Sequence, residues 1–422
     1  MKGKIKEITG KLIIGMTVWI AIISSHGSCA VLLGKAYRVL LFFVGMSYFP
    51  IISRREHCEK YKSTIIPIIT GRVGFAINYR EFPQIDKTTV KRRELPDIEF
   101  ACYNDVYITG DSDVIVDKNN GCIIYDLCYN RDPNVISVDG LLYRDKNNVG
   151  VLRTNFYGNV VSIKDGVMIS GKFSYNYFHV IYENLIRLLV INESQELPEN
   201  VPLLVDASIS RISSFNEIFN ILRKNIKREV FFIEPRVIYK VSTLWHISPV
   251  NKLVPHLSNP GLRGDYFLYD CKFMKRLRDM FLESISNIAT PKRIFLSRKH
   301  TRQRKFNEEE LFEKLVPLGF QKVYPENYSF SEQVALYHNA DVIIGGTGAA
   351  FSNIICCAPK CKIVCFRSST IGEEQPIFSS IANVADADFW YYKPIPSTKK
   401  ESVHANYKID TMNFVEDLSA LI

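Results

Sequence analysis

The sequence predicts an α/β protein in which two units with parallel sheets follow a β-rich segment. The first observation is a change of pattern after Gly171, where helical spacing of apolar residues begins to alternate with short buried strands. The second is a longer series of strands and helices between residues 293 and 366. Such alternation is typical of parallel sheets covered by helices. The third is a run of short β-prone segments between about residues 100 and 169, punctuated by turn residues.

Length and composition indicate a globular protein with more than one packed unit. The chain has 422 residues, of which 47% are hydrophobic and 23% are charged. It is too long for one ordinary hydrophobic core and too apolar to be disordered. The 53 Lys and Arg residues exceed the 44 Asp and Glu residues, which gives a formal charge of +9. This excess suits a membrane surface, a phosphorylated ligand or nucleic acid equally well.

The pattern predicts four parts: residues 1–55, a β-rich segment 56–170, a first α/β unit 171–275 and a second α/β unit 276–422. The β-rich segment contains the expected strands 106–109, 114–116, 122–125 and 160–163. The first unit contains the expected helices 178–189 and 213–223 and the strands 201–205 and 230–233. The second unit contains the expected helices 269–288, 308–315 and 331–338 and the strands 293–297, 322–324, 341–344 and 362–366. Ligands of such sheets bind at the carboxyl ends of the strands, so the cleft between the two units is the expected site.

Residues 1–55 predict an association with membranes. Four lysines precede the apolar run Leu12–Ile23, and a second apolar stretch covers Val31–Ile52. Each uninterrupted run is shorter than the roughly 20 residues that span a bilayer, so a single signal anchor fits poorly. A signal peptide ending near Ser28-Cys29-Ala30 fits the first run, and a buried helical extension is a further alternative. Two amphipathic or re-entrant helices lying on an anionic membrane surface fit both runs, and we favour them.

The ten cysteines are scattered along the chain, with no CxxC pair and no histidine at metal-ligand spacing. The tightest group is Cys356, Cys357, Cys361 and Cys365, where small apolar side chains pack well against a strand. Core packing is therefore favoured over a metal site. The number of cysteines permits disulfides, but their spacing gives no disulfide framework. Cysteine usage therefore does not indicate whether the protein resides in an oxidising or a reducing compartment.

A glycine-rich turn follows the expected strand 341–344 and is the first candidate site. Glycines 345, 346 and 348 allow a ligand to approach the backbone, and the helix that follows presents free N–H groups. Such a turn suits a diphosphate, although similar turns also occur without a phosphate ligand. Ser352 and Asn353, one turn into the helix, can add polar contacts or simply solvate its face.

A basic loop from Ser297 to Glu309 follows another strand of the same unit. Its guanidinium groups can clamp phosphate oxygens and stabilise the charge on a departing diphosphate. Alternatively it is a solvated loop that leads into a helix capped by Asn307. A nucleic-acid patch is less favoured, because no aromatic residues are interleaved with the bases and no nucleic-acid-binding motif is visible.

His179 and Glu183 form the third candidate, because a spacing of four residues puts both on one face of a helix. Either side chain can accept a proton from a hydroxyl while the other orients it. A satisfied surface pair is the structural alternative, and Arg187 on the same face can pair with Glu183 instead. The acidic pattern Asp111-Ser112-Asp113 lies in a turn-rich stretch where Asp is an ordinary turn former, and we expect no essential metal there.

Together, three segments resemble glycosyltransferase family 61 in order and spacing: Asn176–Leu188, the Ser297-Arg298 to Asn307-Glu308 run, and Glu332-Gln333 with Ala340–Asn353. The resemblance extends from about Val106 to Trp390 and implies a GT-B-like fold, with two Rossmann-like domains that face a cleft. It also implies an inverting transfer from a nucleotide sugar, usually a UDP-sugar. Thr347 stands where many members have histidine, so an imidazole contact with the donor is lost or replaced by a hydroxyl.

We expect acceptor binding within residues 171–275 and donor binding within residues 276–422. The expected base is Glu183 or His179, of which we favour Glu183 with His179 beside it, and we expect no metal cofactor. The candidate donor-binding residues are Arg298, Arg302, Arg304, Asn307, Glu308, Gly346, Thr347, Gly348, Ala349 and Asn353.

The resemblance further implies a hexosyl- or pentosyltransferase of surface polysaccharide synthesis, acting on a glycan or glycolipid of capsule or lipopolysaccharide. The cytoplasmic face of a bacterial inner membrane is the favoured location, and the lumen of the secretory pathway is the alternative. A non-catalytic glycan-binding or assembly protein of the same fold is the alternative function. Nucleic acid is not an expected partner.

Overall fold

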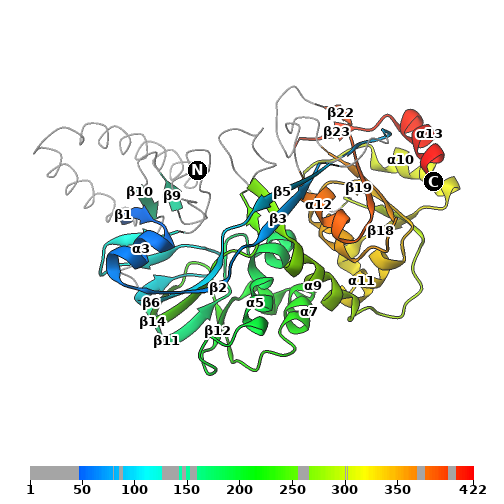
Figure 1. Ribbon diagram of the computed structural model, residues 1–422. Helices are drawn as coiled ribbons and strands as arrows, with labels where there is room; N and C mark the ends of the chain where they lie inside the picture. Colours follow the sequence, from blue (N-terminus) through cyan, green and yellow to red (C-terminus); the bar gives the residue numbers. More distant parts are fainter. Residues whose placement is uncertain are drawn as a thin grey trace, which may run out of the picture.

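The computed structural model describes residues 47–78, 80–84, 89–125, 142–144, 149–152, 159–254, 266–299, 301, 303–367, 376–397 and 405–422. The strands of these residues form several sheets, and helices alternate with the strands along the chain, which confirms the predicted α/β class (Figure 1). The apolar run Leu12–Ile23 and most of the second apolar stretch lie outside the described residues. Within the described part of the chain, no helix is both long enough and apolar enough to cross a bilayer.

The end of the second apolar stretch differs from the prediction. Residues Ser47–Ile52 form a strand, β1, which pairs with β10 (Val149–Leu152) and β8 (Cys122–Ile124). A helix over Val31–Ile52 is therefore wrong at its carboxyl end. Backbone pairing with two neighbouring strands outweighs the helical pattern there.

The largest sheet has eleven strands within the described residues and joins the β-rich segment to the first α/β unit. Its strands, from one edge to the other, are β13 (Val230–Ile233), β12 (Leu203–Asp206), β11 (Val160–Met168), β14 (Ile238–Ile247), β6 (Ile98–Ile108), β7 (Ile115–Asp117), β8, β1, β10 and β9 (Leu142–Arg144), with β2 (Thr64–Ile69) also paired to β6. The first four are parallel, and their order reverses between β11 and β14. Because β11 precedes residue 171, the predicted boundary between residues 170 and 171 does not coincide with a break in the sheet.

The second α/β unit contains a parallel sheet in the order second, first, third, fourth and fifth strand along the chain. Its strands are β18 (Gln321–Val323), β17 (Arg293–Leu296), β19 (Val342–Gly346), β20 (Lys362–Phe366) and β21 (Asp388–Tyr392). The order reverses between β17 and β19. In open sheets of this kind the reversal opens a crevice at the carboxyl ends of the two strands, and ligands bind there.

A segment of the predicted β-rich part reaches across to the second unit. Strands β3 (Val73–Ile77) and β5 (Val90–Glu94) form a small sheet with β16 (Phe267–Asp270) and β15 (Lys252–Leu253), and β4 (Arg80–Glu81) adds to the edge of β21 (Figure 1). The predicted parts are thus interleaved in space. A short two-stranded sheet, β22 (Ile395–Pro396) with β23 (Tyr407–Lys408), lies near the carboxyl terminus.

The predicted helices are present with two main differences, and the structure adds α3, α6, α12 and α13, which the sequence analysis did not predict. The helices are α3 (Arg54–Tyr61), α4 (Tyr177–His179), the π-helix η2 (Val180–Leu185), α5 (Arg187–Glu193), α6 (Ser208–Arg211), α7 (Ser213–Leu222), α9 (Cys271–Leu282), α10 (Glu308–Leu315), α11 (Phe330–Asn339), α12 (Ile377–Val384), α13 (Thr411–Leu421) and the 3-10 helices η4 (Val316–Leu318), η5 (Pro325–Asn327) and η6 (Ala349–Cys356). First, the expected helix 269–288 begins two residues later, because Tyr269 belongs to β16 and Asp270 caps α9 by accepting from the N–H of Phe273 at 2.9 Å, and it ends at Leu282, six residues earlier than predicted. Second, the expected helix 178–189 contains a π-helical turn.

One hydrophobic core runs through both α/β units and includes residues such as Val180 and Leu189 from the first unit and Ile343 and Phe351 from the second. At its centre, α4 and η2 pack against η6. The Tyr177 hydroxyl donates to Asn353 Oδ1 at 2.9 Å, and Asn353 Nδ2 donates to Gln333 Oε1 at 2.7 Å. Asn353 is only 1% exposed, so its amide is a buried bridge between the units.

Replacing Asn353 with Ala should lower the free energy of unfolding by about 2–4 kcal/mol, because it leaves two partly or fully buried groups without partners. Urea denaturation followed by circular dichroism measures this change. Tyr177→Phe removes only one donor and should cost about 1 kcal/mol. Equal losses for the two variants would contradict the bridging role of Asn353.

Candidate functional site

The basic loop and the glycine-rich turn meet at the carboxyl ends of β17 and β19. Arg298 Nη1 and Arg304 Nη1 each donate to the backbone oxygen of Thr347, both at 2.8 Å. The glycine at 348 permits this approach, since a Cβ atom there would lie 2.2 Å from Arg298 Nη1. In the sequence, α10, β18 and α11 lie between these two segments. The segments meet in space because β17 and β19 are neighbours in the sheet, where the strand order reverses.

Positive charge is concentrated and half-buried at this point. Burial lowers the pKa of Arg298, and burial together with the charge of Arg298 lowers the pKa of Arg304. Both guanidinium groups still stay protonated, because arginine is not deprotonated in proteins. Arg298 Nε is buried and has no hydrogen-bond partner among the described residues. This concentration of positive charge suits an anionic ligand.

The neighbouring predicted residues hold the loop in place. Glu308 accepts hydrogen bonds from the Ser297 hydroxyl and, at 2.9 Å, from the N–H of Arg298. Asn307 stands at the start of α10 without capping it, so the predicted side-chain cap is wrong. Its amide instead exchanges hydrogen bonds with the backbone of Ile409, at 2.8 and 3.0 Å. The carboxy-terminal segment satisfies that amide better than the helix end does.

The remaining predicted donor residues occupy different environments. Gly346 is the last residue of β19, so the strand extends two residues further than predicted. Thr347 is buried, and its backbone N–H donates to the oxygen of Phe366 at 2.8 Å. Ala349 begins η6 and is half-buried. Arg302 lies outside the described residues.

Tyr407 is a residue of this cluster that the sequence analysis missed. Its ring stacks on Phe306 with centroids 5.3 Å apart, and a Cβ atom on Gly346 would lie 2.7 Å from its hydroxyl oxygen. The hydroxyl is buried and has no hydrogen-bond partner among the described residues. No sequence signal identified it, because Tyr407 lies in a short strand near the end of the chain, far in the sequence from Phe306 and Gly346.

A second cluster forms around His179 and Glu183, which are hydrogen-bonded through His179 Nδ1 and Glu183 Oε1. Glu183 is 12% exposed. Burial alone raises the pKa of Glu183, but the charges of His179, Lys172 and Arg187 outweigh it and hold that pKa below its usual value. Glu183 is therefore a carboxylate at neutral pH, and it accepts the proton that His179 carries on Nδ1.

A small cavity adjoins Glu183 at the reversal between β11 and β14. It has a volume of about 20 Å³, enough for one water molecule but not for a sugar ring. It is lined by Asp113, Glu183, Arg187, His246, Pro249, Asn251 and Leu253. Sequence analysis missed His246 and Asn251, because strand pairing rather than a local motif brings them to the cavity.

Arg187 and the acidic pattern Asp111-Ser112-Asp113 also take part in this cluster. Arg187 Nη2 pairs with Asp113 at 3.5 Å and Nη1 donates to the oxygen of Ser170 at 3.1 Å, so it does not form the alternative ion pair with Glu183. Asp111 instead accepts from the N–H of Ser174 at 2.8 Å. The two carboxylates therefore have separate partners.

A larger pocket of about 380 Å³ lies beside the small cavity and shares Pro249 and Asn251 with it. Its wall is rich in charged side chains, namely Arg54, Arg55, Arg72, Glu94, Asp97 and Lys252. This volume is in the range of small-molecule pockets.

The cluster at Arg298 and the cluster at Glu183 are separate in space, but the helices that adjoin them pack against each other. Arg298, Arg304, Gly346, Thr347 and Gly348 meet in one place, whereas none of them lines the cavity at Glu183. The link is the packing of α4, which carries His179, against η6, which begins directly after the glycine-rich turn. The Tyr182 hydroxyl adds a hydrogen bond of 2.6 Å to the oxygen of Ser352.

Residues 177–364 match the model of the family described as Glycosyltransferase 61. The match begins at α4 and ends within β20, so it includes the basic loop, the glycine-rich turn and the His179–Glu183 pair and excludes the β-rich segment. No curated protein matches the chain.

Gly348→Ala should weaken the binding of UDP by about 10- to 100-fold, because the new methyl group displaces the Arg298 guanidinium and removes one charge-assisted hydrogen bond. Isothermal titration calorimetry measures the change. Lys305→Ala is the matched control, since it removes a positive charge from an exposed side chain of the same loop. A similar loss in both variants would point to general electrostatic attraction rather than to the arginine pair.

The pH dependence of stability should carry a contribution from Asp206, which accepts hydrogen bonds from Asp111, Ser170 and Gly171. Burial raises the pKa of Asp206 from 3.8 to about 7. Between these values the folded state keeps a proton that the unfolded state has lost, so stability falls as the pH rises. Relative to Asp206→Asn, which cannot ionise, the unaltered protein should lose stability between about pH 4 and pH 7. Urea denaturation across this range checks it, and parallel stability curves would exclude the effect.

Proposed function

We propose that this chain, which belongs to glycosyltransferase family 61 over residues 177–364, moves a sugar from a nucleotide-sugar donor to a hydroxyl group of a glycan in one inverting displacement. The family makes the protein a glycosyltransferase. The single observation that best supports the donor side is the pair of half-buried guanidinium groups, of Arg298 and Arg304, at the Thr347 oxygen. This arrangement suits the diphosphate of a UDP-sugar.

In the proposed reaction the acceptor oxygen bonds to the anomeric carbon while the bond from that carbon to the diphosphate breaks. The diphosphate leaves with the electron pair, and Arg298, Arg304 and the N–H groups at the start of η6 stabilise its negative charge. One attack from the face opposite the leaving group inverts the anomeric carbon. Because guanidinium groups meet this charge, we propose that transfer does not need a metal ion.

The hydrogen bond between His179 and Glu183 favours His179 as the base. With the proton on Nδ1 donated to the Glu183 carboxylate, Nε2 has a lone pair for the proton of the acceptor hydroxyl. Glu183 then orients the ring and stabilises its positive charge. This assignment exchanges the roles expected from the sequence, where Glu183 was the favoured base.

The acceptor is proposed to enter through the larger pocket beside the cavity at Glu183. The small cavity holds about one hydroxyl or water, and the neighbouring pocket of about 380 Å³ has room for a sugar. Its charged wall suits the many hydroxyl groups of a glycan. We propose a hexosyl or pentosyl transfer in surface polysaccharide synthesis, of capsule or lipopolysaccharide, at the cytoplasmic face of a bacterial membrane. The net charge of +9 and the apolar runs before residue 47 support the membrane setting.

Variants of His179 and Glu183 should lose turnover and keep donor binding. His179→Ala should lower the rate of sugar transfer by about 10²–10⁴-fold, the usual contribution of a general base. Glu183→Gln should lose less, since its side-chain oxygen can still accept from Nδ1. A transfer assay with a panel of hexosyl and pentosyl UDP-sugars, with and without a chelator, measures these rates. Glu196→Gln, an exposed residue beyond α5, is the control.

Three outcomes would count against parts of this proposal. A larger loss in Glu183→Gln than in His179→Ala would return the base to Glu183. Loss of activity with the chelator that magnesium or manganese restores, and zinc does not, would contradict metal-independent transfer. If no UDP-sugar raises the melting temperature and none is turned over, the protein is the non-catalytic glycan-binding alternative.

A further inference from the structure

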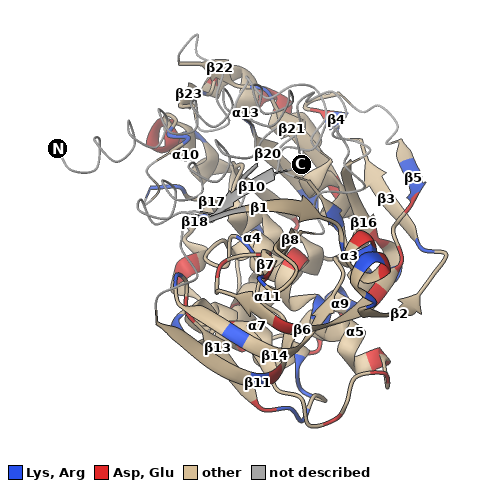
Figure 2. Cartoon of the chain, turned by 90° about the vertical axis from the view of Figure 1, so that its left-hand side faces the viewer, with Lys and Arg blue, Asp and Glu red and all other residues tan. Residues whose placement is uncertain are grey.

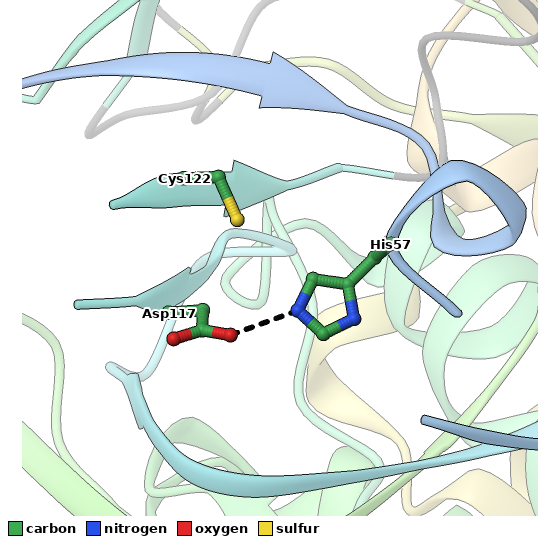
Figure 3. Close-up of side chains that lie close together, drawn as sticks. All are labelled: His57, Asp117 and Cys122. Carbon is green, nitrogen blue, oxygen red and sulfur yellow. Dashed lines mark hydrogen bonds and ion pairs between the residues drawn. The ribbon is translucent and has the colours of Figure 1, made fainter. Parts of the chain in front are cut away.

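Three buried side chains of different chemistry meet far from the donor site. They are His57 on α3, Asp117 at the end of β7 and Cys122 at the start of β8, and their ligand atoms all lie within 4.8 Å of one another. The exposed fractions of these residues are 2%, 3% and 1%. Figure 3 shows the imidazole, the carboxylate and the thiol facing a common space.

We propose that His57, Asp117 and Cys122 bind a zinc ion that fastens α3 to the turn between β7 and β8. Imidazole nitrogen, thiolate sulfur and carboxylate oxygen are the three ligand types that zinc takes from proteins. A thiolate disfavours magnesium and calcium, which prefer oxygen ligands. One thiolate, one carboxylate and a neutral imidazole also cancel the double charge of the ion, which keeps the buried site neutral.

The surroundings of the ligands are already those of a metal site. Ser63 Oγ lies 3.1 Å from His57 Nδ1, so it can accept the proton of that nitrogen and leave Nε2 for the metal. Asn120 donates to both oxygens of Asp117, from its backbone N–H at 3.0 Å and from Nδ2 at 2.7 Å. Partners of this kind orient metal ligands and strengthen binding.

The imidazole and the carboxylate need only a small adjustment, and the Cys122 thiol, which lies within 4.8 Å of both, would approach them to about 3.5 Å. His57 Nε2 and Asp117 Oδ2 are 2.8 Å apart and directly hydrogen-bonded (Figure 3). Zinc, at about 2.0–2.1 Å from each in tetrahedral geometry, would hold them about 3.3 Å apart. The two side chains would therefore separate by about half an ångström. Three protein ligands leave a fourth position for water, while the ring of Tyr103, edge-on at 5.3 Å, shields the imidazole.

The location indicates a structural role. Helix α3, which carries both basic and acidic side chains in Figure 2, follows β1 and begins with Arg54 and Arg55. Both arginines pair with Glu99 and line the larger pocket. Anchoring His57 to the β7–β8 turn thus fixes one wall of that pocket. The three ligands share no residue with the cavity at Glu183.

Metal content and cobalt substitution test this site on the full chain. We expect about one zinc per chain by atomic emission after purification without chelator. Cobalt added to the chelator-treated protein should give a thiolate-to-cobalt charge-transfer band and the visible bands of tetrahedral cobalt. Cys122→Ser should lose that charge-transfer band, and Asp117→Asn should bind less than a tenth of the zinc. Cys102→Ser, a half-buried cysteine on neighbouring β6, is the matched control and should bind zinc fully.

A milder variant separates a metal role from a folding defect. Ser63→Ala keeps all three ligands and should weaken zinc binding by about 10- to 100-fold, the usual effect of losing a partner of a ligating histidine. The proposal is overturned if the unaltered protein binds neither zinc nor cobalt, or if Cys122→Ser keeps the charge-transfer band. Since the readout is metal content, it does not depend on sugar transfer.

Discussion

The packing of α4 and η2 against η6 is the interface on which the rest of the site depends. The two parallel sheets each have a crevice where their strand order reverses, and these crevices belong to different units. The contact between these helices, with its buried Tyr177–Asn353–Gln333 chain, fixes one crevice relative to the other, together with contacts such as the hydrogen bond of 2.7 Å from the N–H of Phe330 to Glu217. Buried polar chains of this kind are stabilising only when every member has a partner. The interface therefore specifies one arrangement rather than a range of them.

The two clusters differ in how their charges are arranged. At Arg298 and Arg304, two cations converge on a neutral carbonyl oxygen, which leaves a net positive field at the strand ends. At Glu183, several cations surround one carboxylate and keep it ionised despite burial. The first arrangement attracts an anionic ligand, and the second keeps an ionised Glu183 hydrogen-bonded to the His179 imidazole, which orients the ring. A reaction with an anionic leaving group and a proton to remove uses both.

Sequence reasoning located the features that lie within one local segment. The glycine-rich turn, the basic loop and the His179 and Glu183 spacing could all be found in this way, as could most elements of the second α/β unit. It failed where residues distant in the sequence meet. His57 and Cys122 have no metal-ligand spacing, Tyr407 reaches Gly346 from the carboxy-terminal segment, and His246 reaches Glu183 through strand pairing. The β11 strand was assigned to the wrong part because its short β-prone pattern does not reveal its parallel neighbours.

The π-helical turn explains why the Arg187 prediction also failed. In a regular α-helix, residues 179, 183 and 187 share one face and Arg187 competes for Glu183. Here the N–H of Ile186 bonds to the oxygen of Ile181 at 3.2 Å, which widens the turn between Glu183 and Arg187. Arg187 then pairs with Asp113, and Glu183 is left to His179. Wide turns of this type are rare and occur frequently at functional sites. The helix therefore departs from regular α-helical hydrogen bonding at the place where the Glu183 carboxylate bonds to the His179 imidazole rather than to the Arg187 guanidinium group.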